Sequence, residues 1–170
     1  MSDINRTLFI IKPDGVERGV IGKIITQLED RGLKIIALKL MRASRELAEK
    51  HYGDLDVRLT KKDLDGATIK SQMIDFLLSG PVVAMVIEGV KAVEYVKRLS
   101  GSTYPNESDL GTIRGMFGHM TRFHANNTNR AVRNLVHASD PDEDPEHEIG
   151  LWFTADELVS YDHVHQAHTW

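Results

Sequence analysis

The chain has no cysteine among its 170 residues, which excludes a disulfide framework and a zinc site built on thiolates. Aromatic residues are scarce, at 6%, and basic residues are not in excess, since 21 Lys and Arg stand against 25 Asp and Glu. A general binder of nucleic acid or of anionic membranes needs an excess of positive charge. We therefore expect neither as a partner, whereas a small anionic ligand would need only a few local cations.

Long hydrophobic runs are also absent. No stretch approaches the roughly 18 uninterrupted apolar residues of a membrane-spanning helix, and the first residues, MSDINRT, lack the pattern of a secretory signal. Apolar residues make up 41% of the chain and charged residues 27%, which is typical of globular proteins. We expect one domain over residues 1–170, without linkers, in a cytoplasmic protein.

The two halves of the chain show the same order of predicted elements. In the first half, a strand at 7–11 precedes a helix with apolar residues at spacings of three and four, a strand at 33–41 and a short helix at 44–52. The second half predicts a strand at 82–87, a helix at 93–99, a long polar loop at 102–133, a strand at 135–136 and a helix at 139–149 capped by Ser139. This order predicts an α/β sandwich of the ferredoxin-like, split βαβ type, with a four-stranded antiparallel sheet and flanking helices. Segments 57–68 and 116–132 do not fit a compact connection.

Two segments contain cations that could bind phosphate, but neither matches a known phosphate loop. In the segment KPDGVERG, Lys12 ends a strand, and Gly22-Lys23 is followed by Ile24 instead of the Ser or Thr of a P-loop. Arg114 stands between glycines in GTIRG, where its planar donors could hold phosphate. Taken alone, each residue is better explained as a solvated surface charge.

Six of the eight histidines fall into three groups. His163, His165 and His168 crowd the C-terminus without the ligand spacing of a metal site, so we expect a solvated tail and no metal site. His119 and His124 lie in the polar loop and are predicted to be exposed.

His137 differs from the others because it ends a predicted strand next to a predicted helix start, in the segment NLVHASD. Glu148 follows eleven residues later, about three turns along that helix. A neutral imidazole is a competent nucleophile or base at pH 7, and a carboxylate on its other nitrogen would fix the tautomer. A single histidine near a core is nevertheless more often structural, so spacing alone leaves both interpretations open.

Five segments together resemble the nucleoside diphosphate kinase family: KPDGVERG, SGPVVAMVIEG, GTIRG, NLVHASD and EIGLWF. They occur in the family's order, and the resemblance covers residues 7–153. The resemblance implies a ferredoxin-like fold and a homo-oligomer. It also implies transfer of the γ-phosphate of a nucleoside triphosphate to a nucleoside diphosphate through a phosphohistidine, with Mg²⁺ bound to the nucleotide.

Matched position by position, the resemblance implies a catalytic group. His137 corresponds to the phosphorylated histidine, and Glu148 would orient its ring. Lys12 and Tyr52 correspond to the pair beside the transferred phosphate, and Ser139 lies at a matching offset from the histidine.

The same comparison implies a nucleotide-binding group. Thr103 and Arg114 match phosphate-binding positions, Asn134 matches a position beside the histidine, and Lys12 is shared with the catalytic group. Lys97 stands where the family usually has an arginine. Cations and hydroxyls of this kind offset the charge of a phosphoryl group during transfer.

The chain departs from the family where the base should bind. After Arg58 the family has a Pro-Phe-Phe segment whose ring stacks on the base, but here the sequence reads LTKK with extra residues before SGP. Leu59, Leu64 or Tyr104 could substitute for the ring. Two other classes stay open: a catalytically impaired nucleotide-binding regulator, and a nucleic-acid-binding module, which the acidic charge disfavours.

Overall fold

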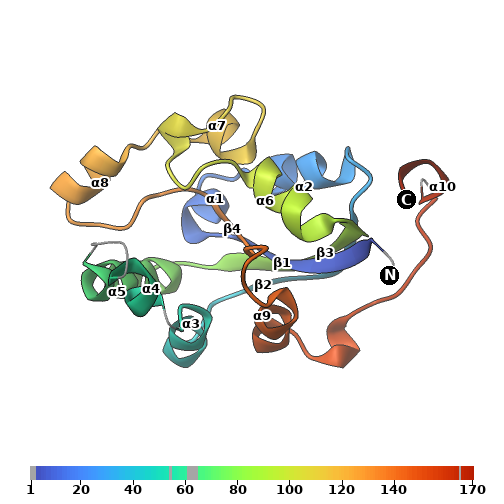
Figure 1. Cartoon of the computed structure of the whole chain (residues 1–170), viewed down its shortest axis with the longest axis horizontal. Helices are drawn as coiled ribbons and strands as arrows, with labels where there is room; N and C mark the ends of the chain where they lie inside the picture. The colour runs from blue at the N-terminus through green and yellow to red at the C-terminus, as the bar shows by residue number, and fades with distance from the viewer. Residues whose placement is uncertain (1–2, 54, 61–64, 165) are drawn as a thin grey trace.

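A sheet of four antiparallel strands lies at the centre of the protein, as a computed structural model of the chain shows (Figure 1). The structure describes residues 3–53, 55–60, 65–164 and 166–170. Over these residues the sheet contains β1 (Ile4–Ile11), β2 (Lys34–Met41), β3 (Val82–Val90) and β4 (Val136–Ala138). Their spatial order is β2-β3-β1-β4 and the pairings are antiparallel. The predicted fold class is confirmed.

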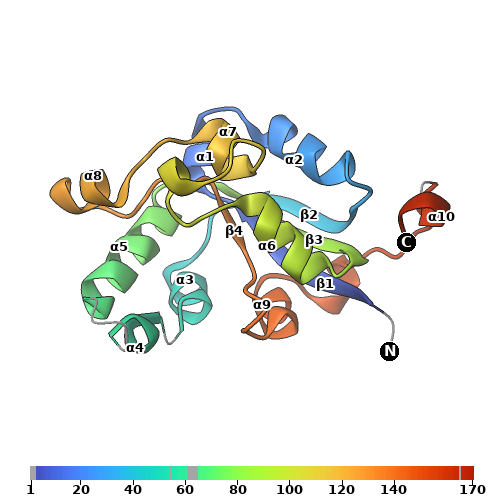
Figure 2. The same ribbon diagram turned by 45° about the horizontal axis from the view of Figure 1, so that its top comes forward.

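Helices cover both faces of this sheet (Figures 1 and 2). One face carries α1 (Pro13–Glu17), α2 (Ile21–Glu29), α6 (Ala92–Ser100) and α7 (Ile113–Phe117). The other carries α3 (Arg45–His51), α5 (Gly66–Leu78) and α9 (Pro145–Trp152), with α4 (Leu55–Thr60) beside α5. Further short elements are η1 (Pro105–Glu107), α8 (Arg122–Asn127), η2 (Ala155–Glu157) and α10 (Gln166–Thr169).

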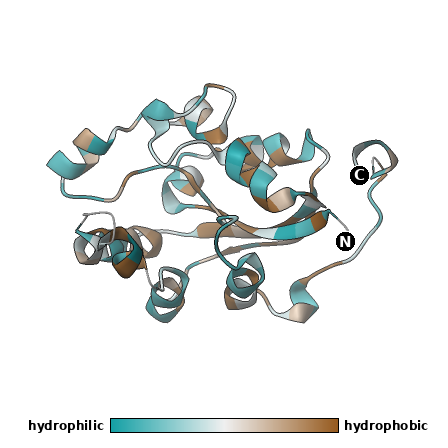
Figure 3. Ribbon diagram, in the orientation of Figure 1, coloured by the Kyte–Doolittle hydropathy of each residue, from teal (hydrophilic) through white to brown (hydrophobic). Residues whose placement is uncertain are grey.

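The central strand β1 separates two hydrophobic cores, because successive side chains of a strand point to opposite faces. Phe9 and Ile11 pack with residues of α2 and α6, whereas Leu8 and Ile10 pack with residues of α3, α5 and α9. Hydropathy follows this arrangement, since the strands are largely hydrophobic and the outlying α8 is largely hydrophilic (Figure 3). Burial on both faces explains why β1 contains an unbroken apolar run.

Two segments that the sequence predicted to be irregular contain helices. The predicted polar loop at 102–133 contains η1, α7 and α8, and segment 57–68 falls partly on α4 and α5. Thr112 and Thr121 cap α7 and α8 by accepting hydrogen bonds from backbone N–H groups three residues on. These helices have only five and six residues, which is too short for apolar periodicity to reveal them.

The C-terminal segment packs against the edge strand β2, so the prediction of a solvated tail is wrong for part of it. The N–H of Val159 donates to the carbonyl of Ile36 over 2.8 Å, and Nε1 of Trp170 donates to the carbonyl of Gly32 over 3.2 Å. The ammonium of Lys34 lies 4.7 Å from the centroid of the Trp170 ring. A cation held against an aromatic face in this way stabilises the packing of the segment.

The histidines outside the predicted catalytic group are mostly at the surface. His119, His124 and His168 are exposed, as predicted, whereas His163 is half-buried and His165 lies outside the described residues.

In the part of the chain that the structure describes, none of the helices has the length and apolar character needed to cross a membrane.

Candidate active site

The alternation of strand β4 decides where the side chain of His137 points. Val136 and Ala138 are buried in the core that contains residues of α2 and α6. Because side chains alternate along a strand, His137 points to the opposite face, toward α3 and α9. Backbone pairing with Ile10 of β1 fixes its position along the sheet.

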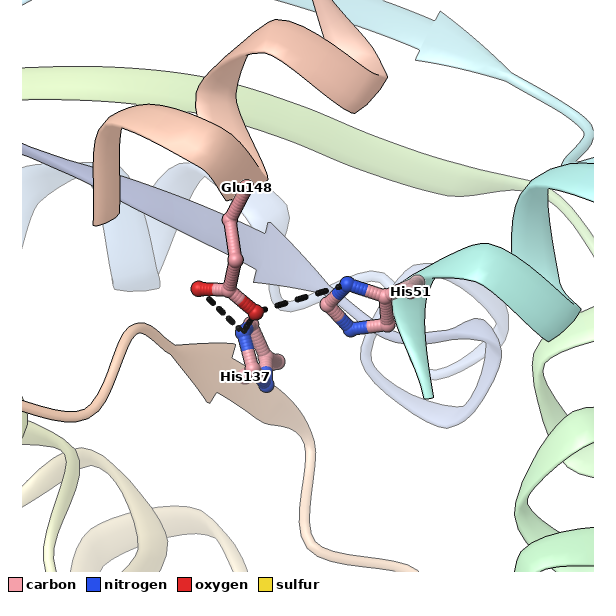
Figure 4. A group of neighbouring side chains, drawn as sticks. All are labelled: His51, His137 and Glu148. Carbon is pink, nitrogen blue, oxygen red and sulfur yellow. Dashed lines mark hydrogen bonds and ion pairs between the residues drawn. The ribbon is translucent and has the colours of Figure 1, made fainter. Parts of the chain in front are cut away.

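Glu148 holds the His137 ring through one of its two nitrogens (Figure 4). Nε2 of His137 lies 3.1 Å from Oε1 and 3.4 Å from Oε2 of Glu148. An ionised carboxylate only accepts hydrogen bonds, so Nε2 carries the proton of the neutral ring and the lone pair is on Nδ1. The side chain of His137 is 20% exposed, against 9% for Glu148. A ligand can therefore reach the His137 ring, and the lone pair of that ring lies on Nδ1.

Glu148 lies in the first turn of α9, which corrects the prediction that it lies three turns along a helix capped by Ser139. The helix begins at Pro145, and Asp144 caps it by accepting a hydrogen bond from a backbone N–H of the first turn. The Ser139 hydroxyl instead accepts a hydrogen bond from the N–H of Leu8 on β1, over 3.2 Å. The sequence signal for the true start was the Asp-Pro pair, because proline favours the first helical position.

Burial and nearby charges keep the His137 ring neutral near pH 7. Burial lowers the pKa of His137, the interaction with Glu148 opposes this effect, and the charges of Lys12 and Lys97 reinforce it. A neutral ring retains the lone pair that a nucleophile needs. For Glu148, burial raises the pKa, but the hydrogen bonds from His137 and Ser139 help to bring the pKa below its ordinary value. The pair is therefore an ionised glutamate beside a neutral histidine.

Lys12 follows β1 with its ammonium in the interior of the protein, although the sequence was compatible with a solvated charge. The residue is 4% exposed. Its Nζ donates to Oδ1 of Asn134 over 2.9 Å, and Nδ2 of Asn134 donates to the carbonyl of Thr103 over 3.0 Å. Burial, reinforced by the charge of Arg114, lowers the pKa of Lys12 to about 7. An anionic phosphate beside this ammonium would favour its protonated form.

A strained turn positions the residues just before His137. Leu135 has a φ of 68°, and the N–H of Val136 donates to the carbonyl of Asn134 over 2.7 Å, which defines the rare type of γ-turn with positive φ. The N–H of Leu135 donates to Oδ2 of Asp14 over 3.1 Å, and its carbonyl accepts from the N–H of Lys12 over 2.7 Å. These bonds stabilise a conformation that costs free energy, and they join the end of β1 to the start of β4.

Arg114 is buried in α7, which corrects the alternative of a surface arginine in a loop. The residue is 7% exposed. Its guanidinium donates to four backbone carbonyl groups over 2.8–3.1 Å, those of Gly101, Ser102, Asn134 and Val136. Arg114 therefore ties the segment after α6 to the segment before His137. A guanidinium has five N–H groups, so these bonds leave one N–H without a partner among the described residues.

Two further cations pair with carboxylates of the loop between β4 and α9. Nζ of Lys97 lies 2.9 Å from Oδ2 of Asp140, and Arg58 pairs with Glu143. The side chain of Lys97 is 40% exposed, so a phosphate group can compete with Asp140 for its ammonium. Thr103 is also exposed, and these two predicted residues lie at the rim of the site.

Tyr52 is connected to His137 and Glu148 through His51, a residue that the sequence analysis missed. The ring of Tyr52 packs edge-on against His51, with 4.8 Å between centroids, and burial raises the pKa of its hydroxyl. His51 in turn lies 4.4 Å from the His137 ring centroid, and its Nδ1 is 3.5 Å from Oε1 of Glu148. The available signal was its position immediately before the matched tyrosine, at the end of α3.

A neutral, partly exposed histidine near a buried lysine is compatible with a phosphotransferase that forms a covalent intermediate. A comparison with protein families agrees, because the family described as nucleoside diphosphate kinase matches residues 5–158. The chain belongs to the nucleoside diphosphate kinase family, and its activity is the phosphotransfer of that family.

Similar proteins support the assignment over nearly the whole chain. The nucleoside diphosphate kinase of Pyrococcus horikoshii is 44% identical over 161 residues, which cover 95% of this chain and 92% of the relative. The kinase of Pyrococcus furiosus is 42% identical over 161 residues, or 95% and 90% of the two chains. The Borrelia burgdorferi enzyme, solved as a transition-state mimic with vanadate and ADP, has a TM-score of 0.91 at 34% identity and covers 98% and 96%. The Halobacterium salinarum enzyme in complex with CDP has a TM-score of 0.77 at 39% identity, covering 96% of each chain.

Proposed function

We propose that His137 carries the phosphoryl group between two nucleotides, so that the kinase works in two half-reactions. The 3.1 Å contact between Nε2 of His137 and Glu148 supports this, because it leaves the lone pair on Nδ1 of a ring that ligands can reach. In the first half-reaction, Nδ1 attacks the γ-phosphorus of a nucleoside triphosphate. A P–N bond forms, the bond to the bridging oxygen breaks, and the diphosphate leaves with that electron pair. A second diphosphate then takes the phosphoryl group in reverse.

Glu148 acts on the charge that this reaction creates. As Nδ1 shares its lone pair with phosphorus, positive charge develops on the His137 ring, and the Nε2–H bond to the carboxylate becomes charge-assisted. Such an interaction is stronger in the transition state than in the free enzyme, so it accelerates the chemical step more than it strengthens nucleotide binding.

We assign the nucleotide phosphates to the cations beside His137. The Lys12 ammonium and the remaining N–H of Arg114, both on buried residues, would bind the phosphates from the protein interior. Asn134 holds Lys12, and Lys97 and Thr103 would bind from the rim. The Borrelia burgdorferi relative supports this assignment, because it was solved with bound vanadate, a phosphoryl mimic, together with ADP. Tyr52 and Ser139 are the remaining members of the proposed catalytic group.

Mg²⁺ would enter with the nucleotide. Within the described residues, the side chains grouped at metal-binding distance are His51, His137 and Glu148, whose ligand atoms lie within 4.8 Å of one another. Mg²⁺ prefers oxygen ligands and often binds through substrate phosphates, so a group with two imidazoles does not suit it. When bound to the nucleotide, the ion would supply charge neutralisation at the phosphates, and the residues of this chain would orient them.

The test is phosphorylation of the protein by γ-labelled ATP with Mg²⁺. We expect a phosphate that is stable to base and labile to acid, transfer of this phosphate to added diphosphates, and loss of labelling in His137→Ala. His168→Ala is the control, because His168 is exposed far along the chain. Labelling that persists in His137→Ala would overturn the assignment, and binding of ADP without any labelling would support the alternative of an impaired regulator.

We further propose a homo-oligomer of one-domain chains, located in the cytoplasm. Leu38 and Leu40 on the edge strand β2 are 51% and 63% exposed, which is unfavourable unless another chain covers them. Light scattering of the wild type and of Leu40→Lys tests the oligomer, since the substitution should lower the measured mass.

A further inference from the structure

The carboxylate of Glu148 lies between two histidine rings, and the mechanism above uses only one of them (Figure 4). Oε1 is 3.1 Å from Nε2 of His137 and 3.5 Å from Nδ1 of His51. The two rings are nearly perpendicular, at 78°, with centroids 4.4 Å apart. The side chain of His51 is 1% exposed, so it cannot meet a nucleotide directly. Any role in catalysis must act through its neighbours.

The position of the proton on His51 follows from its surroundings. If Nδ1 carried a lone pair, that lone pair would face an ionised carboxylate oxygen and be repelled by it, whereas an Nδ1–H would donate a charge-assisted hydrogen bond. Nε2 of His51 is buried and has no hydrogen-bond partner within the described residues. An orphaned N–H donor is rarer in proteins than an under-satisfied acceptor. With the proton on Nδ1 the buried Nε1–H of Trp152 loses its acceptor, so the count of orphaned donors favours neither tautomer. The repulsion by Glu148 is what places the proton on Nδ1, toward the carboxylate.

Trp152 competes for the same nitrogen. Its Nε1 lies 3.4 Å from Nδ1 of His51, and the two rings are perpendicular, with centroids 5.5 Å apart. The indole Nε1–H can only donate, and Nδ1 cannot accept from Trp152 while it donates to Glu148. A hydrogen bond to a charged group contributes roughly twice as much as a neutral one, so the bond to Glu148 prevails and Trp152 confines the ring by packing.

We propose that His51 is a positioning residue of this active site, which donates its Nδ1–H to Glu148 and thereby fixes the carboxylate that orients His137. This inference rests on the proposed role of His137 and adds a second donor to its partner. Glu148 is on a helix of eight residues, and its carboxylate would otherwise rotate about the side-chain bonds. Oε1 would then accept hydrogen bonds from Nδ1 of His51 on α3 and from Nε2 of His137 on β4.

The donor from His51 also sets the basicity of Glu148. The groups that face His51 are Glu148 of α9, His137 of β4, Lys12 after β1 and the neighbouring Tyr52. Burial lowers the pKa of His51 well below its ordinary value, and the charge of His137 adds to the effect. His51 therefore stays neutral at working pH. Loss of its N–H would leave more negative charge for His137 to experience, which raises the pKa of His137.

Three substitutions of His51 separate this role from simple packing. The amide of His51→Asn can place an N–H near the position of Nδ1, the longer His51→Gln places it near Nε2, and His51→Leu has none. The measurement is the single-turnover rate of His137 phosphorylation by Mg-ATP from about pH 5 to 9, together with ADP affinity. We expect His51→Leu and His51→Gln to slow phosphorylation about 10- to 100-fold, as for other partners that orient a functional histidine, with ADP affinity within about twofold.

The pH profile gives a readout that packing alone would not change. In His51→Leu the acidic limb, where His137 gains a proton, should move upward by about half a pH unit, and His51→Asn should restore both the rate and the limb. Trp152→Phe keeps an aromatic ring and removes the N–H. It should leave the rate within about twofold of the wild type and the acidic limb at the same pH. Thermal unfolding of each variant reports whether it is folded.

Two results would overturn the inference. One is equal loss in His51→Asn and His51→Leu with an unmoved acidic limb, which would mean that His51 only fills space. The other is a loss in Trp152→Phe as large as in His51→Leu, which would mean that Nδ1 accepts from Trp152. Either result leaves the proposed function intact if His137→Ala still abolishes labelling. Labelling that persists in His137→Ala would instead refute the proposed function itself.

Discussion

Nε2 of His137 lies 3.1 Å from Oε1 of Glu148, and this contact joins the short strand β4 to the first turn of α9. The contact has two consequences for the proposed phosphorylation of His137. It fixes the proton on Nε2 and so leaves the lone pair on Nδ1. It also places a negative charge where the proposed transfer would create positive charge on the ring. Each consequence can be tested separately, because an amide can accept the Nε2–H without supplying the charge.

The substitution Glu148→Gln should therefore slow phosphorylation of His137 about 10- to 100-fold and leave the affinity for ADP nearly unchanged. An interaction made mainly in the transition state lowers the rate rather than binding. Single-turnover labelling and titration with ADP measure the two quantities. Glu146→Gln is the matched control, because Glu146 is exposed on the same helix and pairs with Arg6. A large loss of affinity at an intact rate would show that Glu148 is a structural residue.

Nucleotide binding should take up a proton at Lys12. The pKa of Lys12 is lowered to about 7, so at pH 8 most molecules lack this proton, and a bound phosphate should raise the pKa and restore it. Above pH 7 the affinity for ADP should fall, by up to about tenfold per pH unit, until the pH reaches the pKa of Lys12 in the complex. Calorimetry at pH 8 in two buffers of different ionisation enthalpy counts the protons.

Measurement at pH 8 excludes the nucleotide as the group that takes up the proton, since a phosphate with a second pKa of ~6 is already ionised at that pH. We expect uptake of about one proton in the wild type and in Lys23→Met, whose side chain is exposed on α2. Lys12→Met should show weaker binding and no uptake. Equal binding heats in the two buffers would mean that Lys12 does not change its protonation when ADP binds.

Arg114→Lys should reduce both stability and activity. The arginine donates to four backbone carbonyl groups in the interior, and a lysine ammonium has three donors that cannot reproduce this planar arrangement. We expect the free energy of unfolding in urea to fall by about 2–4 kcal/mol, because buried acceptors lose their partners. Arg122→Lys, at an exposed position of α8, should change it by less than about 0.5 kcal/mol. An unchanged unfolding midpoint in Arg114→Lys would contradict this structural role.

The core elements were predictable because their apolar residues either recur at helical spacing or form a continuous run. Ile24 and Leu28 on α2, and the apolar run of β3, are buried where the pattern placed them. The short α7 and α8 were not predictable, since five or six residues barely complete one turn and a half. The start of α9 was misplaced because Ser139 is a good capping residue in isolation, but its hydroxyl bonds to β1.

The site was predictable as a set of residue types and not as a geometry. Lys12 and Arg114 are compatible with a surface location when considered singly, and only the fold shows that both are buried. His51 was missed because a histidine at the end of a helix has no distinctive spacing from Glu148, 97 positions later in the chain. Long-range contacts of this kind are fixed by the layering of α3, β4 and α9, which sequence patterns do not encode locally.

Nucleotide affinity should depend more on phosphate contacts than on the base. The stacking ring expected after Arg58 is missing from the sequence, and the ring of Phe76 cannot substitute, because it is buried and the guanidinium of Arg133 lies 3.8 Å above its centroid. Leu59 and Tyr104 are half-buried, whereas Leu64 lies outside the described residues. Base stacking on an aromatic ring contributes about 1–3 kcal/mol, and this contribution should be largely absent.

Titration of ADP, GDP and CDP at low and high salt tests this expectation. The three affinities should agree within about fivefold, a difference of about 1 kcal/mol, and all should weaken as salt screens the exposed Lys97 at the rim. Leu59→Ala and Tyr104→Ala identify any side chain that has taken over the base contact, because the responsible variant should lose affinity for purines first. Tight, purine-selective binding that ignores salt would contradict the expectation and show that another group supplies the missing base contact.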